Sequence, residues 1–577
     1  MPVTSPFASL IDQVTIDAPW SLVEAFSKMP RWKPVDVEGA AHDIAGRLKA
    51  LGVPVRLEEA NLHLSIPYTA SVTAGGETFN AKPPAYARDC REGLTAPLVH
   101  VPATISNSIN TLFVKSQDPK ASSEENIRGK IIISEGFSFP GKILEFEEKG
   151  ALGVIAINPG ADSHHGICTS IWGTPDLDDL PRKPTIPVAA VNNPDGQKLL
   201  KIAQAGGEVT IRTEMEQGWY KSLIPVVDIP GSEEPEKFVL LHGHYDSWDV
   251  GVGDNATGDA AMLEIARVLW ANKGELKRTV RIAWWPGHST GRYAGSTWYA
   301  DTHALDLDEN CVAQVNCDSP GCRWATEFRD VSWMKETESF CQQTIREVTG
   351  LESQGDRPHR AGDYAFNNIG LSSFFMLSST MPEQLRKEKD YYAVGGCGGN
   401  IAWHTEHDQL EIADKDILLR DTKVYLAAVM GVATAGVLPF DWRTIAAEFS
   451  ETIASYQEAA GSLADLSPAA KAASDLAAAL EAFYASIENG TLTPAQANPV
   501  IQRLARILVP VNHTNKPRFR HDPALPVLPL PAIAVAKDLA GYGPDKIGFA
   551  QTQMVRGVNR VAAAIKDATR LVQGASK

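Results

Sequence analysis

Four short apolar runs between residues 237 and 440 constrain the fold more than any other feature of this sequence. Stretches with helical periodicity, such as GDAAMLEIARVLWANKG, separate them. Short apolar runs alternating with helices are typical of strands buried on both faces of a largely parallel sheet. The sequence therefore predicts an α/β layer architecture in this region. The runs are FVLLHGH (238–244), TVRIAWWP (279–286), CVAQVNCD (311–318) and LSSFFMLSS (371–379).

The segments around this region follow other patterns, and 577 residues are too many for a single core. Residues 66–224 are rich in short β runs and turns, such as GKIIISEG and ALGVIAINPG, with the helical KILEFEEKG between them. Residues 441–577 are helical, apart from a proline-rich stretch at 513–533. We therefore predict a core formed by 1–65 and 225–440, a β-rich insert at 66–224 and a helical domain at 441–577.

Charge and cysteine usage narrow the class of protein. A formal net charge of −16 disfavours nucleic acid and anionic membranes as partners. No apolar run is long enough for a membrane span, and the N-terminus lacks the pattern of a secretory signal. Seven scattered cysteines without a CxxC pair are typical of a reducing compartment. These features predict a cytoplasmic protein.

Polar residues follow the apolar runs, where the carboxyl ends of parallel strands gather ligands. Imidazole and carboxylate groups bind zinc, and also manganese, iron or nickel. We predict one or two divalent cations here, zinc first, with the Asp246 carboxylate holding the second nitrogen of the first histidine. A lone histidine at a strand end is more often an ordinary polar residue, but four candidates on separate segments favour a metal site. They are His244, Asp254, Asp318 and His404.

Three motifs carry a resemblance to a known family: HGHYDSWDVGVGDNATGDAA, VNCDSPG and AWHTEHDQL. They resemble the metal-site motifs of family-28 zinc exopeptidases, in particular the glutamate carboxypeptidase II and transferrin-receptor type. That group has a protease-associated β domain inserted in its peptidase domain and a helical dimerisation domain at its end. The resemblance implies these identities for 66–224 and 441–577, and hence a homodimer.

The same resemblance assigns roles to the candidate ligands. It implies that His244 and Asp318 are ligands of one and the other metal and that Asp254 bridges the two. His404 matches a further ligand, and Asp246 matches the aspartate that supports the first histidine.

The stretch WWPGHSTGRYAGSTW (284–298) departs from the family pattern. Family members carry adjacent glutamates here, the first a general base and the second a metal ligand. This chain has His288 and Ser289 in their places. Histidine can move protons near neutral pH or act as a further nitrogen ligand. A neutral hydroxyl is a poor cation ligand, so the second metal position is expected to be weakened or lost.

Two functions are compatible with this departure. The first is a metal-dependent enzyme, derived from a zinc exopeptidase scaffold, that acts on a small substrate by amide or ester hydrolysis or by metal-assisted elimination. Its catalytic candidates are His288 and Ser289, and ordinary peptidase activity is doubtful. The second is an inactive homologue that serves as a binding or scaffold dimer. The retained ligand residues favour the enzyme.

The substrate is predicted to be a small, carboxylate-bearing molecule, because arginine can hold a carboxylate with two hydrogen bonds. For each arginine, the alternative is a surface ion pair with one of the many acidic residues. The tryptophans Trp284, Trp285 and Trp403 would line a pocket, but a tryptophan is more often part of the core than a contact to a ligand. The candidate substrate-binding residues are Arg292, Arg360, Tyr364, Arg520 and His521.

Overall fold

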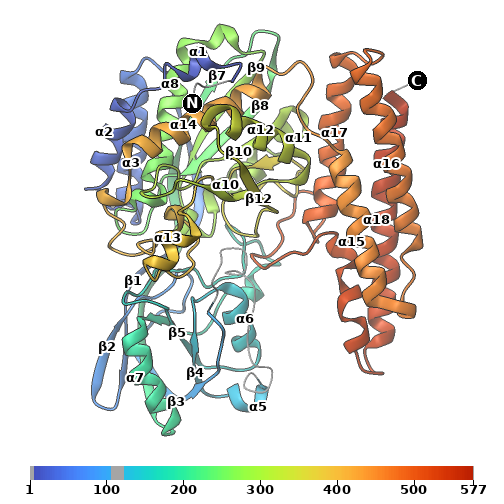
Figure 1. Cartoon of the computed structure of the whole chain (residues 1–577). Helices are drawn as coiled ribbons and strands as arrows, with labels where there is room; N and C mark the ends of the chain where they lie inside the picture. The colour runs from blue at the N-terminus through green and yellow to red at the C-terminus, as the bar shows by residue number, and fades with distance from the viewer. Residues whose placement is uncertain (1–4, 106–122, 576–577) are drawn as a thin grey trace.

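Four parallel strands form the part of the central sheet that holds the apolar runs (Figure 1). The computed structural model describes residues 5–105 and 123–575. The predicted α/β fold with a mixed, mostly parallel sheet between helices is confirmed. Across the sheet the strands are β13 (Ser373–Phe374), β10 (Cys311–Asn316), β8 (Glu234–His244) and β9 (Arg278–Trp285).

The strand β13, which belongs to the fourth apolar run, is much shorter than predicted. Only Ser373 and Phe374 of the run 371–379 are extended and paired, with β10. The next residue, Phe375, has a φ of 66°, which lies in the left-handed region and ends the extended conformation.

Alternate residues of the central strands enter two different cores, as the period of a strand requires. Val239 and Leu241 belong to one core, whereas Phe238 and Leu240 belong to the other. The first core is covered by α2 (Asp17–Phe26), α3 (Pro34–Ala50), α8 (Thr257–Ala271) and α14 (Lys415–Ala433). The second is covered by α10 (Ala294–Thr302) and α11 (Ala304–Asn310).

Two long antiparallel strands continue the central sheet into the β-rich part. β1 (Arg56–Ala74) pairs with β7 (Glu208–Ile229) along almost their whole length. The limits predicted at 65/66 and 224/225 fall inside these two strands, so the same backbone ladder runs through both parts of the chain.

The β-rich part adds a parallel ladder in the order β3, β4, β5, β6 (Figure 1). Ile132 faces α6 on one side of this ladder, whereas Ile131 and Ile133 face α7 on the other. The identity of this part as a protease-associated domain stays a prediction. Its elements are β2 (Glu77–Ala81), β3 (Cys90–His100), β4 (Ile131–Glu135), α6 (Pro140–Glu148), β5 (Gly153–Ile157), β6 (Val188–Val191) and α7 (Asn193–Gln204).

Four long helices form a bundle beside the core (Figure 1). The third begins with a capping box, in which Thr493 and Gln496 each hydrogen-bond the other's backbone N–H. A dimerisation role for this bundle stays a prediction. The helices are α15 (Arg443–Ala460), α16 (Ser467–Glu488), α17 (Pro494–His513) and α18 (Ile547–Ala575), with η8 (Pro531–Gly541) packed against them.

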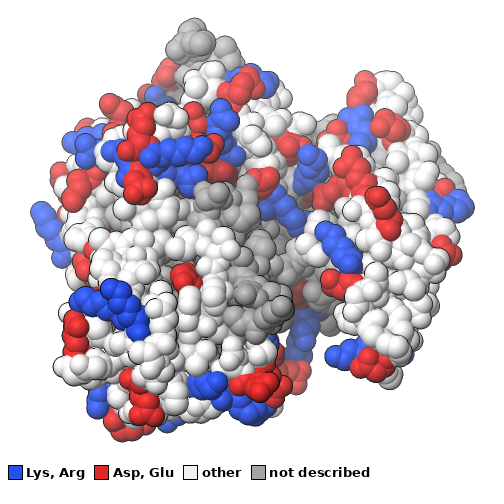
Figure 2. All heavy atoms as spheres, turned by 60° about the horizontal axis from the view of Figure 1, so that its bottom comes forward, with Lys and Arg blue, Asp and Glu red and all other residues white. Residues whose placement is uncertain are grey.

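The remaining elements are short, apart from α12. Acidic and basic side chains are interspersed over the face that Figure 2 presents. Among the described residues, no helix is long and apolar enough to span a membrane. The elements are α1 (Ala8–Ile11), α5 (Glu124–Ile127), η1 (Leu180–Arg182), η2 (Val252–Ala256), η3 (Lys273–Glu275), α9 (His288–Gly291), β11 (Phe328–Ser332), η4 (Lys335–Thr337), α12 (Glu338–Thr349), β12 (Ser353–Asp356), α13 (Glu383–Glu388), η5 (Cys397–Gly399), η6 (Leu410–Ile412) and η7 (Gly461–Leu463).

The buried Glu336 gives a testable pH dependence of stability. Burial raises the pKa of its carboxyl to about 7 in the folded protein, against about 4.3 in an unfolded chain. The folded state therefore binds the proton more tightly, and this carboxyl lowers stability as pH rises from about 4.3 to about 7. We expect Glu336→Gln to be more stable than the wild type at pH 8, by up to about 3 kcal/mol, and to lose this advantage near pH 4.

The measurement is urea unfolding of wild type and variant at several pH values. The exposed Glu481→Gln serves as the control, with midpoints expected to follow the wild type throughout. A difference between Glu336→Gln and wild type that does not change with pH would show that the Glu336 carboxyl is not the cause.

Candidate metal centre

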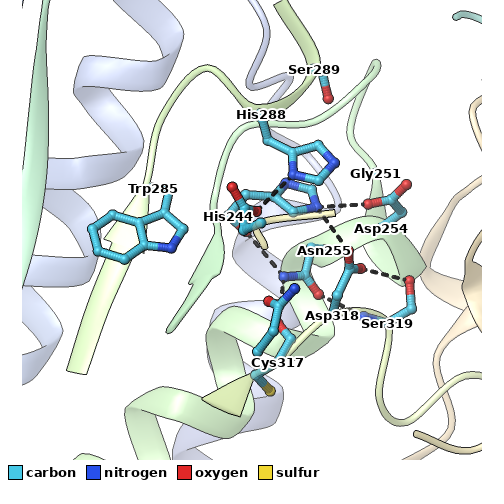
Figure 3. A network of polar contacts seen from close by, with 12 residues as sticks. His244, Gly251, Asp254, Asn255, Trp285, His288, Ser289, Cys317, Asp318 and Ser319 are labelled. Atoms are coloured by element: carbon cyan, nitrogen blue, oxygen red, sulfur yellow. Dashed lines mark hydrogen bonds and ion pairs between the residues drawn. The ribbon is translucent and has the colours of Figure 1, made fainter. Parts of the chain in front are cut away.

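Four ligand-type side chains from distant segments meet at the carboxyl ends of the central strands. His244 is the last residue of β8, and Asp318 follows β10 by two residues. Asp254 lies in η2, directly before α8, and His404 lies in the loop after η5. All four are buried or nearly so, and Figure 3 shows Asp254 and Asp318 facing the imidazole of His244.

The distances place the ligands around the two oxygens of Asp254. His244 Nε2 lies 3.0 Å from Asp254 Oδ1 and 3.6 Å from Asp318 Oδ2. His404 Nε2 lies 3.1 Å from Asp254 Oδ2. The two oxygens of Asp254 therefore face the two histidines, and His244 and Asp318 lie together on one side of it. The assignment of His244 and Asp318 to one and the other metal stays a prediction.

Two buried atoms at this centre fit a cation. His244 Nε2 and Asp254 Oδ1 have no hydrogen-bond partner of good geometry among the described residues. Single ligand atoms of His244, His288 and Asp318 all lie within 4.8 Å of one another. Buried polar atoms are normally satisfied, so two unpaired atoms within a cluster of imidazole and carboxylate groups are suited to a divalent metal.

The charges of the centre also favour a cation. Burial disfavours a charged imidazole, but Asp254 and Asp318 outweigh it and raise the pKa of His244 well above its usual value. Burial likewise opposes a charged Asp254, yet His244 and His404 hold the pKa of this carboxyl well below its usual range. Asp254 is therefore a carboxylate, and a proton on His244 partly supplies the positive charge that the cluster attracts.

Asp246 has a different role from the one predicted. Nδ1 of His244 faces the backbone oxygen of Asp246 at 2.9 Å, and the Asp246 carboxylate is 3.9 Å away. That carboxylate instead accepts hydrogen bonds from the backbone N–H groups of His288 and Ser289, each at 2.9 Å. Asp246 thus orients His244 through its backbone and fixes the start of α9 through its side chain.

His288 belongs to a buried chain of hydrogen bonds. Its Nδ1 lies 2.8 Å from Asp363 Oδ2, and the hydroxyl of Ser296 donates to Asp363 Oδ1 at 2.5 Å. Burial raises and His288 lowers the pKa of the Asp363 carboxyl, with a net decrease. The His288 ring stacks on the His244 ring with centroids 3.7 Å apart. A carboxylate on Nδ1 leaves Nε2 of His288 for the pocket.

Asp363 and two further residues were missed by the sequence analysis. Asp408 accepts hydrogen bonds from the N–H groups of Gly253 and Asp254 at 2.7 and 3.0 Å, and burial raises its pKa to about 7. The amide of Asn255 donates to the carbonyl oxygens of His244 and Cys317. These contacts fix the loop that presents Asp254. Asp408 lies in the quoted motif AWHTEHDQL and Asp363 in RPHRAGDYAF, but no local pattern marked either.

A pocket of about 60 Å³ opens beside the centre, between the core and the β-rich part. Asp254, Asp318, His288 and His404 line it, whereas Ser289 does not. The predicted catalytic role of Ser289 therefore has no support in its position.

Of the predicted substrate-binding residues, only Arg292 lines this pocket. Arg360 donates to the carbonyl oxygens of Asp522 and Pro523, and Tyr364 is fully buried away from the pocket. Arg520 and His521 line a separate depression, where they pair with acidic residues. These four side chains have structural partners, so they are not available to a ligand at the metal centre.

Of the three tryptophans considered above, one lines the pocket and two lie in the core. Trp403 lines the pocket and stacks on His404, with ring centroids 3.6 Å apart. Trp284 and Trp285 are fully buried on opposite faces of β9, so they belong to the core, the alternative given for them, and do not line the pocket. Successive strand residues point to opposite faces, and both faces here are covered by core.

Comparison with known proteins agrees with this geometry. The sequence model described as Peptidase family M28 matches residues 226–429, which include all four ligand-type residues. Carboxypeptidase Q of Rattus norvegicus is 28% identical over 229 residues, 37% of this chain and 48% of that protein. Probable glutamate carboxypeptidase VP8 of Zea mays is 33% identical over 235 residues, 39% of this chain and 32% of that protein. Each match spans half or less of the relative's length.

Solved structures share the fold. BSAP, a zinc aminopeptidase from Bacillus subtilis, has a TM-score of 0.54 and 20% identity, covering 72% of this chain and 94% of that chain. An aminopeptidase from Aneurinibacillus sp. strain AM-1 has a TM-score of 0.53 and 18% identity, covering 74% and 96%. At these identities the likeness is one of fold.

Proposed function

We propose that this chain, whose residues 226–429 match the model of Peptidase family M28, is a metal-dependent enzyme acting on a small substrate. The relatives are named as peptidases, which supports a hydrolase-like scaffold. The observation that carries the proposal is the His288–Asp363 pair at the mouth of the ligand cluster. A scaffold protein has no need of a buried histidine that is held by a carboxylate and directed at a pocket.

The proposed metal is zinc, with manganese, iron or nickel as alternatives, and one ion is expected to bind tightly. His244, Asp318 and Oδ1 of Asp254 form the more complete position. On the side of Oδ2 only His404 approaches, and the pocket has no carboxylate from position 289. A bound cation would supply Lewis-acid polarisation of a substrate carbonyl oxygen.

The proton transfers are assigned to His288. Asp363 accepts the Nδ1–H of His288, so Nε2 can take a proton from an attacking water and return it to the leaving group. In an elimination the same nitrogen would remove a proton next to a carboxylate. Histidine thereby replaces the glutamate base of family members, and ordinary peptidase activity is expected to be weak.

The second candidate function is an inactive homologue that acts as a binding or scaffold dimer. It draws on the loss of the paired glutamates at 288 and 289 and on the helical bundle. A homodimer through α15 to α18 and a cytoplasmic location belong to the proposal in either case.

The test combines metal analysis with an activity screen. Protein purified without chelator or metal-affinity resin is analysed by inductively coupled plasma mass spectrometry and then assayed on N-acyl amino acids, small amides, esters and dipeptides. We expect about one equivalent of a transition metal and turnover of at least one small substrate. Protein that holds no metal and takes up none from micromolar zinc, manganese or iron would favour the scaffold.

A further inference from the structure

Arg292 is a buried arginine whose guanidinium makes no hydrogen bond or ion pair with a described residue, although it lies 4.9 Å from the ring centroid of the neighbouring Tyr293. Its Nε is fully enclosed. Among the described residues, three other arginines are similarly buried: Arg31, Arg278 and Arg506. Each of these donates to two or more backbone carbonyl oxygens. Arg292 alone in this group keeps its donors free, although an unpaired buried charge is costly.

The local backbone brings this side chain to the pocket. Arg292 directly follows α9 and lines the pocket together with His288. Arg292 and Tyr293 both lie in the left-handed region, with φ of 48° and 70°. Two successive non-glycine residues in this region store backbone strain, which is typical of functional sites. The ring of Tyr293 contacts His288 edge-on at 4.7 Å, so the same turn places the base and the guanidinium.

The carboxylates that line the pocket are paired with residues other than Arg292, so the positive charge of Arg292 can attract an anion. Its acidic lining residues are Asp254 and Asp318. Asp254 faces His244 and His404, and Asp318 faces His244 and accepts the hydroxyl of Ser319 at 3.0 Å. Neither carboxylate lies within ion-pair distance of Arg292. The N–H donors of the guanidinium are therefore available for an anionic group of a ligand.

We propose that Arg292 is the specificity-determining residue of this site and holds the carboxylate of a short carboxylic acid substrate. The inference rests on the proposed function and names its substrate class. Guanidinium and carboxylate form paired, charge-assisted hydrogen bonds. The pocket is small, with a volume of about 60 Å³, and Phe137, Phe139 and Trp403 form an apolar wall. A short acid with a small apolar body fits this space better than a peptide.

The experiment measures binding of propionate and of propionamide, its neutral analogue, by saturation-transfer NMR and calorimetry on the protein as isolated. We expect propionate to bind at least tenfold more tightly than propionamide, and Arg292→Leu to bind propionate about 10- to 100-fold more weakly. Arg292→Lys should retain part of the affinity. The surface variant Arg520→Leu is the matched control and should bind as the wild type does.

Two results would overturn the proposal. Equal binding of propionate by wild type and Arg292→Leu would mean that the acid is held elsewhere, for instance by the metal. Tighter, Arg292-dependent binding of methylphosphonate would assign the site to phosphorus oxyanions instead. No turnover is needed, so the comparison remains decisive even if every substrate in the activity screen fails.

The stability of the ligand-free variant separates recognition from a structural role. Apart from its contact with the ring of Tyr293, the guanidinium makes no hydrogen bond or ion pair with a described residue that its removal would lose. We therefore expect Arg292→Leu to unfold at the wild-type temperature or roughly 1–2 °C above it. A lower unfolding temperature in the absence of ligand would show that Arg292 supports the fold, and the proposal would then be wrong.

Discussion

Replacing His288 with alanine is expected to lower kcat on the substrate found by the screen by a factor of about 10² to 10⁴. The reason is geometric: the His288 ring lies against His244, and its Nδ1 is held by the buried Asp363 carboxylate. Metal content measured by mass spectrometry should stay within error of the wild type, because Asp254, Asp318 and His244 remain.

Asp363→Asn and Ser289→Ala are the companion variants. An amide at 363 can donate to Nδ1 and stabilise the wrong tautomer of His288, so it should lose activity nearly as His288→Ala does. Ser289 lies outside the pocket and should tolerate alanine within a factor of about three. Survival of activity within about twofold in His288→Ala would remove the acid–base role from this residue.

The strand-end positions could be predicted because they follow from local pattern and one rule of topology. Apolar runs identified β8, β9 and β10, and the carboxyl ends of parallel strands share one edge of the sheet. The sequence alone therefore predicts His244 and Asp318 at one edge of the sheet. The run 371–379 failed as a strand because a single left-handed residue, Phe375, ends it, and periodicity carries no information on φ.

The partners of the site could not be predicted, because they join residues far apart in the chain. Asp363 meets His288 across 75 positions, and Asp408 meets the Asp254 loop across about 155. Such pairs are set by how loops fold over the sheet edge. For the same reason, the sequence located Arg292 near the site but could not separate it from Arg360, whose guanidinium is used by backbone carbonyl oxygens.

The other prediction with a large expected effect concerns the binding of zinc at the metal centre. Replacing Asp254 with alanine is expected to reduce zinc content from about one equivalent to less than about a tenth, because Asp254 faces both His244 and His404. The variant should still fold, since Asp408 holds the same loop through backbone N–H groups. Circular dichroism checks the fold, and mass spectrometry with zinc titration checks the metal. Retention of a full equivalent would place the ion elsewhere.

The reverse change tests why one ion is expected and not two. Ser289→Glu restores the type of ligand that family members carry at this position, and its longer side chain is intended to reach the incomplete position formed by His404 and Oδ2 of Asp254. Zinc stoichiometry should then rise from about one towards about two equivalents, with Ser289→Gln as the neutral control of similar size. A second equivalent already present in the wild type would mean that His288 or another donor completes that place. Such a result would move His288 from proton transfer to metal binding, and the loss of activity in His288→Ala would then be accompanied by loss of metal.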